Sequence, residues 1–169
     1  MVEERASLSA SFLRDIPPQA LDLILPLMTE RAFQPGQTLF HEGELHQDLH
    51  IVIEGHVRLD MAVPNRGRIS LLTVGPGDVL AWSAVLSPGW MTTSALAMDR
   101  VRTTVLNGIE LQQLCESHPD IGFHVMKQLA VALSRRLVAT RLQLLDLFAE
   151  HQPVPPVLGP HRAPADLED

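Results

Sequence analysis

The hydrophobic pattern changes once along this chain, from short segments in its middle to a long helical stripe near its end. Between residues 32 and 106 the segments are short and rich in Val, Ile, Leu and Thr. Gly, Pro and Asn separate them at 35–36, 43, 55, 64–67, 75–77 and 88–89. This spacing is typical of short strands joined by tight turns, as in a β-sandwich or barrel. The alternation in 49–53 and 57–59 suits strands with one buried face.

Helices are predicted on both sides of these strands. Ile16-Pro17-Pro18 is a helix entry signal, because proline is tolerated in a first turn, and a short helix should reach about Met28. Asn107 can cap a helix that runs to about Glu116, and a longer helix should open at Pro119. The chain is therefore predicted to be mostly β with flanking helices (α+β).

The stripe of the last helix predicts an interface. About 30 residues at ~1.5 Å each give a rod of roughly 45 Å, which is longer than a small β-roll covers by itself. We expect a second copy of the chain to bury it, in a homodimer formed through residues 119–150. The alternative is a helix that packs only on its own core. The expected seam residues are Val125, Leu129, Leu133, Leu137, Leu144 and Phe148.

Charge and composition exclude several classes of protein. The formal net charge is −7 and the only lysine is Lys127, which argues against direct DNA binding through a basic surface. No apolar run approaches the roughly 20 residues of a membrane span. The acidic N-terminus carries no signal-peptide pattern, so a cytoplasmic location is expected. The single cysteine, Cys115, can form no internal disulfide and is interpreted as a small buried hydrophobic residue.

Four histidines lie within 16 residues, at His41, His46, His50 and His56. Their spacing follows no metal-site pattern, so no metal is expected and they are interpreted as solvated. His50 should point away from the core if its neighbours Leu49, Ile51 and Ile53 point inward. The sequence also lacks nucleophile-elbow, P-loop and dinucleotide motifs, so we do not expect an enzyme.

The chain divides into three parts. Residues 1–10 are expected to form a flexible leader, and residues 11–150 one domain that includes the C-terminal helices at 107–150. Residues 151–169 contain five prolines and little apolar content, which predicts a disordered tail able to dock a partner.

Three turn motifs, at 36–44, 51–57 and 74–80, carry a family resemblance. They are Gly-Gln-Thr-Leu-Phe-His-Glu-Gly-Glu, Ile-Val-Ile-Glu-Gly-His-Val and Val-Gly-Pro-Gly-Asp-Val-Leu. In this order, before a helix pair, they resemble the cyclic-nucleotide-binding domain of the catabolite activator and fumarate–nitrate regulator superfamily, over roughly residues 11–150. The resemblance implies a jelly-roll-like β-roll, a phosphate-binding cassette at residues 77–95 and a long dimerising helix.

The resemblance also points to a ligand pocket that departs from the family pattern. Relatives that bind cAMP use a glutamate for the ribose hydroxyl and an arginine for the phosphate, and these positions fall on Trp82 and Thr92 here. Losing a charged partner costs roughly 1.5–3 kcal/mol, so weak cAMP binding is expected. Thr140 matches the position that faces the purine, and Arg141 follows it as a possible cation. The candidate pocket residues are Gly77, Ala81, Trp82, Ser83, Ala84, Thr92, Thr93, Thr140 and Arg141.

We therefore expect a non-enzymatic sensory module that binds a cyclic nucleotide or another small molecule, needs no cofactor and acts through an unidentified protein partner. One alternative is a scaffold without ligand, whose hollow is filled by Trp82 and Trp90. A second is a transcription regulator of the Crp/Fnr type that works with a separate DNA-binding chain, because the 19 residues after Glu150 are too few for a winged helix-turn-helix.

Overall fold

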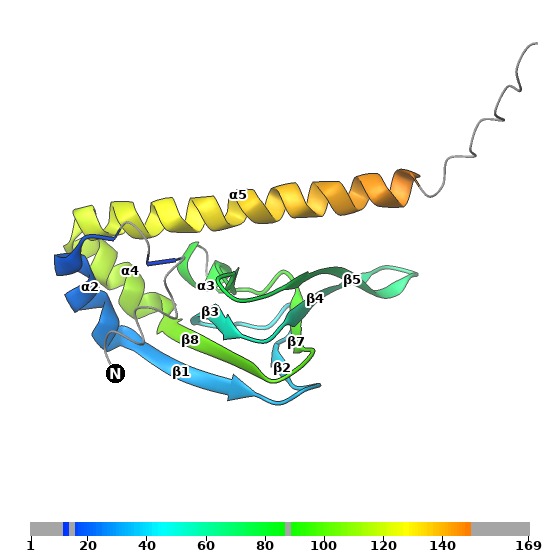
Figure 1. The fold of residues 1–169 in the computed structure, drawn as a ribbon, viewed down its shortest axis with the longest axis horizontal. Helices are drawn as coiled ribbons and strands as arrows, with labels where there is room; N and C mark the ends of the chain where they lie inside the picture. Colours follow the sequence, from blue (N-terminus) through cyan, green and yellow to red (C-terminus); the bar gives the residue numbers. More distant parts are fainter. Residues whose placement is uncertain (1–11, 14–15, 87–88, 150–169) are drawn as a thin grey trace, which may run out of the picture.

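The structure is a computed structural model that describes residues 12–13, 16–86 and 89–149. Within them, eight strands form two four-stranded antiparallel sheets, with helices beside them (Figure 1). This confirms the predicted β-roll with a long C-terminal helix. The first sheet contains, in order, β1 Met28–Phe33, β8 Val101–Asn107, β3 Asp48–Glu54 and β6 Val79–Leu80. The second contains β2 Thr38–Phe40, β7 Ser94–Ala97, β4 Val57–Val63 and β5 Gly67–Val74.

The helices begin at the residues that the sequence marks. Proline opens the first of them, and the Asn107 side-chain oxygen accepts hydrogen bonds from the N–H groups of Ile109 (3.1 Å) and Glu110 (3.2 Å). In Figure 1 the last helix, α5, runs along one side of the roll. The helices are α2 Pro18–Ile24, the 3-10 turn η1 Leu25–Leu27, α3 Ser83–Leu86, α4 Gly108–Ser117 and α5 Pro119–Ala149.

The strands begin four residues earlier than predicted, at Met28 and not at residue 32. Strand β1 lies at the edge of the first sheet, and most of its side chains are exposed. It therefore carries charges such as Glu30 and Arg31 and shows no apolar alternation, which is how sheet edges avoid pairing with other chains.

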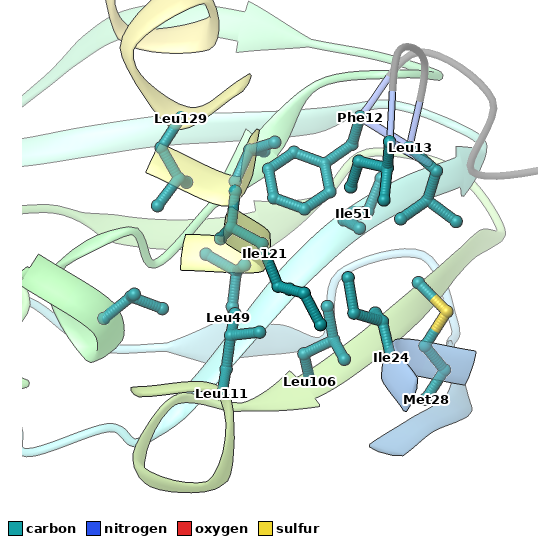
Figure 2. Close-up of a cluster of buried hydrophobic side chains, with 14 of the residues drawn as sticks. Phe12, Leu13, Ile24, Met28, Leu49, Ile51, Leu106, Leu111, Ile121 and Leu129 are labelled. Atoms are coloured by element: carbon teal, nitrogen blue, oxygen red, sulfur yellow. The ribbon is translucent and has the colours of Figure 1, made fainter. Parts of the chain in front are cut away.

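Two clusters of buried apolar side chains form the core. One joins the helices to the first sheet and includes Leu49, Ile51, Leu106 and Leu111 (Figure 2). The other includes Val52, Leu59 and Ala95 and lies between the sheets. Strand β3 is thus covered on both faces.

This double cover overturns the expectation that His50 is solvated. His50 is fully buried, with 0% of its surface exposed. Residues 50 and 52 share one face of β3, and Val52 belongs to the cluster between the sheets. The alternation rule assumes a strand with one face exposed to solvent, whereas both faces of β3 are covered by core side chains.

Helix α5 has an inner and an outer apolar side. Val125 and Leu129 are buried in the chain's own core, so their predicted place in a dimer seam is wrong. Leu133 is half-buried and Leu137 is 52% exposed. The backbone of Leu144 and Phe148 belongs to α5, but their side chains lie outside the described part of the chain, so their seam role stays a prediction.

Cys115 is half-buried and packs against the first core cluster. Burial raises the pKa of its thiol, which disfavours the reactive thiolate. The predicted leader 1–10 and tail 151–169 lie outside the described residues.

Candidate functional site

The cassette begins at a turn that the backbone of β3 holds in place. Gly77 adopts φ +90°, a left-handed conformation that glycine takes at little cost. Its N–H donates to the carbonyl of Val52 at 2.8 Å, and the N–H of Val52 donates to the carbonyl of Asp78 at 2.9 Å. The Asp78 carboxylate accepts a hydrogen bond from the N–H of Gly75 at 2.9 Å. The entrance to β6 is therefore fixed relative to the core of the roll.

The chain turns sharply between β6 and α3. Ala81 has φ +55°, a left-handed conformation that non-glycine residues rarely adopt. Its carbonyl accepts the N–H of Ala84 at 2.9 Å, which starts α3. This turn places Trp82 and Ser83 beside the hollow that follows.

A small hollow lies between the cassette, the second sheet and α5. Its volume is about 10 Å³, the space of roughly one water molecule. Five of the predicted pocket residues line it, namely Ala81, Trp82, Ser83, Thr92 and Thr93. The other lining residues are Phe40, Leu59, Leu80, Met91 and Arg136.

Four predicted pocket residues lie elsewhere. Gly77 belongs to the turn before β6, and the carbonyl of Ala84 faces Gly108 at the start of α4. The Thr140 hydroxyl donates to the carbonyl of Arg136 on its own helix at 2.9 Å, and Arg141 is exposed. Neither Thr140 nor Arg141 is among the residues that line the hollow, so their role in ligand binding stays a prediction.

Arg136 is the charged residue among the lining residues that the sequence reasoning missed. It donates a hydrogen bond to the carbonyl of Val79 in the cassette. Burial lowers the pKa of its guanidinium, and the negative charge of Asp78 opposes this effect. Arginine nevertheless stays charged in proteins, so a cation with little solvent lies in the hollow. The sequence did offer a signal for Arg136, because this residue lies on the same side of the helix as the buried apolar residues before it. The intervals are four, seven and four along the series Val125, Leu129, Arg136 and Thr140.

The two tryptophans differ. Trp82 is half-buried, lines the hollow and packs against the first core cluster. Trp90 is 57% exposed and is not among the lining residues, so it does not fill the hollow as the scaffold alternative assumed. Of the two tryptophans, only Trp82 can supply an aromatic face to a ligand here.

Metal-binding clusters and membrane-spanning helices are absent from the described part of the chain. No group of three or more His, Cys, Asp or Glu side chains there is placed to hold a metal ion. None of the helices described is both long and apolar enough to cross a membrane.

Comparison with known proteins gives a consistent family match. Residues 30–118 match the model of the cyclic nucleotide-binding domain. A CRP-like cAMP-activated global transcriptional regulator of Mycobacterium tuberculosis is 31% identical over 140 residues, which is 82% of this chain and 60% of that protein. The chain thus spans about 60% of the length of this relative.

Solved structures agree with the sequence match. The catabolite activator protein of Thermus thermophilus is 27% identical with a TM-score of 0.64, and the match covers 82% of this chain and 63% of that one. A cyclic nucleotide-binding domain of Methylobacillus flagellatus has a TM-score of 0.76 at 21% identity, over 86% of this chain and 83% of that one. The latter similarity concerns the fold alone.

Proposed function

Because this chain belongs to the cyclic nucleotide-binding domain family, we propose that it is a non-enzymatic regulatory module that senses a small ligand at the cassette. In this proposal, the ligand enters the hollow beside Trp82, and helix α5 carries the response to a protein partner. Direct DNA binding is not part of the proposal, because the net charge is −7 with a single lysine.

One observation carries this proposal: Arg136 links the helix to the cassette. Its backbone belongs to α5, whereas its guanidinium lines the hollow and is hydrogen-bonded to the carbonyl of Val79 in β6. Any ligand that changes the partner of Arg136 must also act on α5. Through such a contact, a ligand that binds differently in two states can bias the position of the output element.

The size of the hollow supports a ligand-driven movement. A space of about 10 Å³ holds no nucleotide, so a nucleotide that enters the hollow must displace Trp82, α5 or both. An anionic ligand would offer Arg136 a charge-assisted hydrogen bond in place of the neutral Val79 carbonyl. The difference between the two partners would shift the balance between the closed state and an opened one.

The lining residues favour a flat anion. Trp82 provides an aromatic face, Thr92 and Thr93 provide hydroxyls at the rim, and Arg136 provides a positive charge. The lining residues include no carboxylate that could accept a ribose hydroxyl. We therefore expect weak cAMP binding and tighter binding of an anion whose recognition needs no such acceptor.

Ligand binding is tested by thermal shift with cAMP, cGMP, cyclic dinucleotides and linear nucleotides. At least one anion should raise the melting temperature. Arg136→Gln should weaken that binding about tenfold to hundredfold, because a hydrogen bond to a charged group contributes roughly 1.5–3 kcal/mol. Arg135→Gln, at the preceding exposed position of the same helix, is the matched control and should bind as the unaltered protein does. If no compound raises the melting temperature, the scaffold alternative is favoured.

The second part of the proposal is a homodimer through the outer side of α5. Four exposed apolar residues follow one another there at intervals of seven, four and three, which places them on one side of a helix. This side lies opposite the one that carries Arg136 into the hollow, since residues two apart on a helix point away from each other. The four residues are Val131, Val138, Leu142 and Leu145, with exposures of 38%, 53%, 57% and 63%.

A charge placed on this side should separate the two copies. Leu142→Glu is expected to give a monomer in size-exclusion chromatography with light scattering, because a carboxylate would be buried against apolar side chains. Gln143→Glu adds the same charge at the neighbouring exposed position, off the apolar side, and should remain dimeric. An unaltered protein that is monomeric at tens of micromolar would contradict the dimer proposal.

A further inference from the structure

A chain of hydrogen bonds between side chains crosses the interior beneath the cassette. The Nε2 atoms of His46 and His50 lie 3.0 Å apart, and Nδ1 of His50 lies 3.1 Å from the hydroxyl oxygen of Thr103 on β8. Both His50 and Thr103 are fully buried. The His46 side chain is 14% exposed, so the chain of bonds reaches the surface only at its His46 end.

This pair lies directly behind the pocket wall. The ring of Phe40, which lines the hollow, is 5.3 Å from the ring of His46 and 6.3 Å from that of His50, measured between centroids. The rings of His46 and His50 are themselves stacked at 5.2 Å.

The backbone around His46 holds the far arm of the cassette. Its N–H donates to the carbonyl of Gly89 at 2.9 Å. The N–H of Gly43 donates to the carbonyl of Met91 at 2.8 Å, and the N–H of Met91 donates to the carbonyl of Glu44 at 2.9 Å. Residues 43–46 and 89–91 are therefore paired, and the second segment runs directly into Thr92 and Thr93 of the pocket wall.

We propose that the His46–His50 pair is a proton-controlled latch that keeps residues 43–46 paired with residues 89–91, and that protonation of His46 releases this pairing. The latch would regulate the cassette of the proposed function, but its test needs no pocket ligand, so the two can fail separately.

The electrostatics around the pair favour the neutral, latched state. Burial lowers the pKa of His46, against the opposing effects of Asp48 and Glu44, and the positive charge of Arg31 on β1 lowers it further. The Glu44 carboxylate lies 3.8 Å from Nδ1 of His46, and Arg31 is paired with Asp48 at 2.9 Å. On the cassette side, the facing residues are Gly89, Trp90 and Met91, none of which titrates.

Lowering the pH should therefore release the paired segments by protonating His46, the more exposed residue of the pair. The His46 side chain is only 14% exposed, so a charged imidazole there loses much of its hydration, and a protonated His46 is driven toward water. Leaving its place breaks the bond to His50 and removes the packing that supports the paired segments. The second proton cannot be accommodated either, since two protonated rings would turn N–H groups toward each other across 3.0 Å.

The test follows the amide groups of Gly43 and Met91 by NMR hydrogen exchange between pH 7.5 and 5.0. In the unaltered protein, their protection relative to intrinsic rates should fall at least tenfold over this range. The amide of Ala97, which donates to the carbonyl of Gln37, reports any loosening of the whole fold and should change less. Equal loss at all three amides, or no loss at Gly43 and Met91, would overturn the proposal.

Two variants isolate His46. His46→Gln keeps an amide that can donate to His50 but cannot gain a charge, so Gly43 and Met91 should stay protected at pH 5.0. His41→Gln removes a nearby exposed histidine and should behave as the unaltered protein does. If His46→Gln fails to fold, the ¹⁵N shifts of the His46 ring in the unaltered protein decide: its titration midpoint must coincide with the loss of amide protection, and separate midpoints would refute the latch.

Discussion

Replacing Gly108 with alanine is expected to lower the free energy of unfolding by about 3 kcal/mol. A Cβ atom at Gly108 would lie 2.1 Å from the carbonyl oxygen of Ala84 and 3.1 Å from that of Gln47, and both are backbone atoms that cannot swing aside. The first turn of α4 would have to move away from α3 and from the loop before β3. Urea unfolding followed by circular dichroism measures the loss.

Gly75→Ala provides the matched comparison. Gly75 does not have a positive φ, and its nearest neighbour would be the flexible His56 ring at 3.4 Å, an ordinary contact. Its free energy of unfolding should change by no more than about 0.5 kcal/mol. If the two variants are equally stable, α4 and α3 are less closely packed than the structure has them.

Lowering the pH from 7 to 5 should remove about 2 kcal/mol of stability through His50 alone. Burial, helped by the neighbouring His46 and Arg31, lowers the pKa of His50 from 6.5 to about 3. At pH 5 the unfolded chain therefore binds a proton at this residue that the folded chain does not. Because the folded pKa is the lower one, this stabilisation is complete above pH 6.5 and is lost as the pH falls toward 3.

The contribution of His50 is isolated by subtraction, since acidic residues also titrate as the pH falls. His50→Asn retains a polar group near Thr103 but does not titrate. Its free energy of unfolding, measured by urea denaturation at both pH values, should depend on pH less steeply than that of the unaltered protein by about 2 kcal/mol. If the free energies of unfolding of the variant and of the unaltered protein have the same pH dependence, His50 takes up its proton while the chain stays folded.

The sequence predicted the fold because its turns have a local cause. Gly43, Gly55 and Gly77 adopt φ of +77°, +84° and +90°, values that side chains disfavour, so their spacing marks where strands reverse. At Gly55 a Cβ would also lie 2.3 Å from the carbonyl oxygen of Arg100, which excludes other residues there. Such turns are visible in sequence without knowledge of what packs on what.

The site was only half predictable, because its other half depends on packing between distant segments. Trp82, Ser83, Thr92 and Thr93 follow the cassette turn in sequence, and all line the hollow. Arg136 comes from a helix 54 residues after Trp82, and its place depends on how α5 is rotated against the roll. Val125 and Leu129 were assigned to the wrong side of α5 for the same reason: an apolar stripe does not say whether it faces the chain's own core or a second copy.

The closed hollow also affects how tightly any compound can be seen to bind. If the opened form is populated to about 1%, the apparent dissociation constant is about a hundredfold weaker than the intrinsic one, because every binding event first requires opening. A substitution that breaks the contact between Arg136 and Val79 without removing the charge, or dimer contacts that pull on α5, would raise affinity with no new contact to the compound. Weak binding of a compound to this domain would then reflect the low population of the opened form. A ligand screen would be most sensitive with variants in which the opened form is more highly populated.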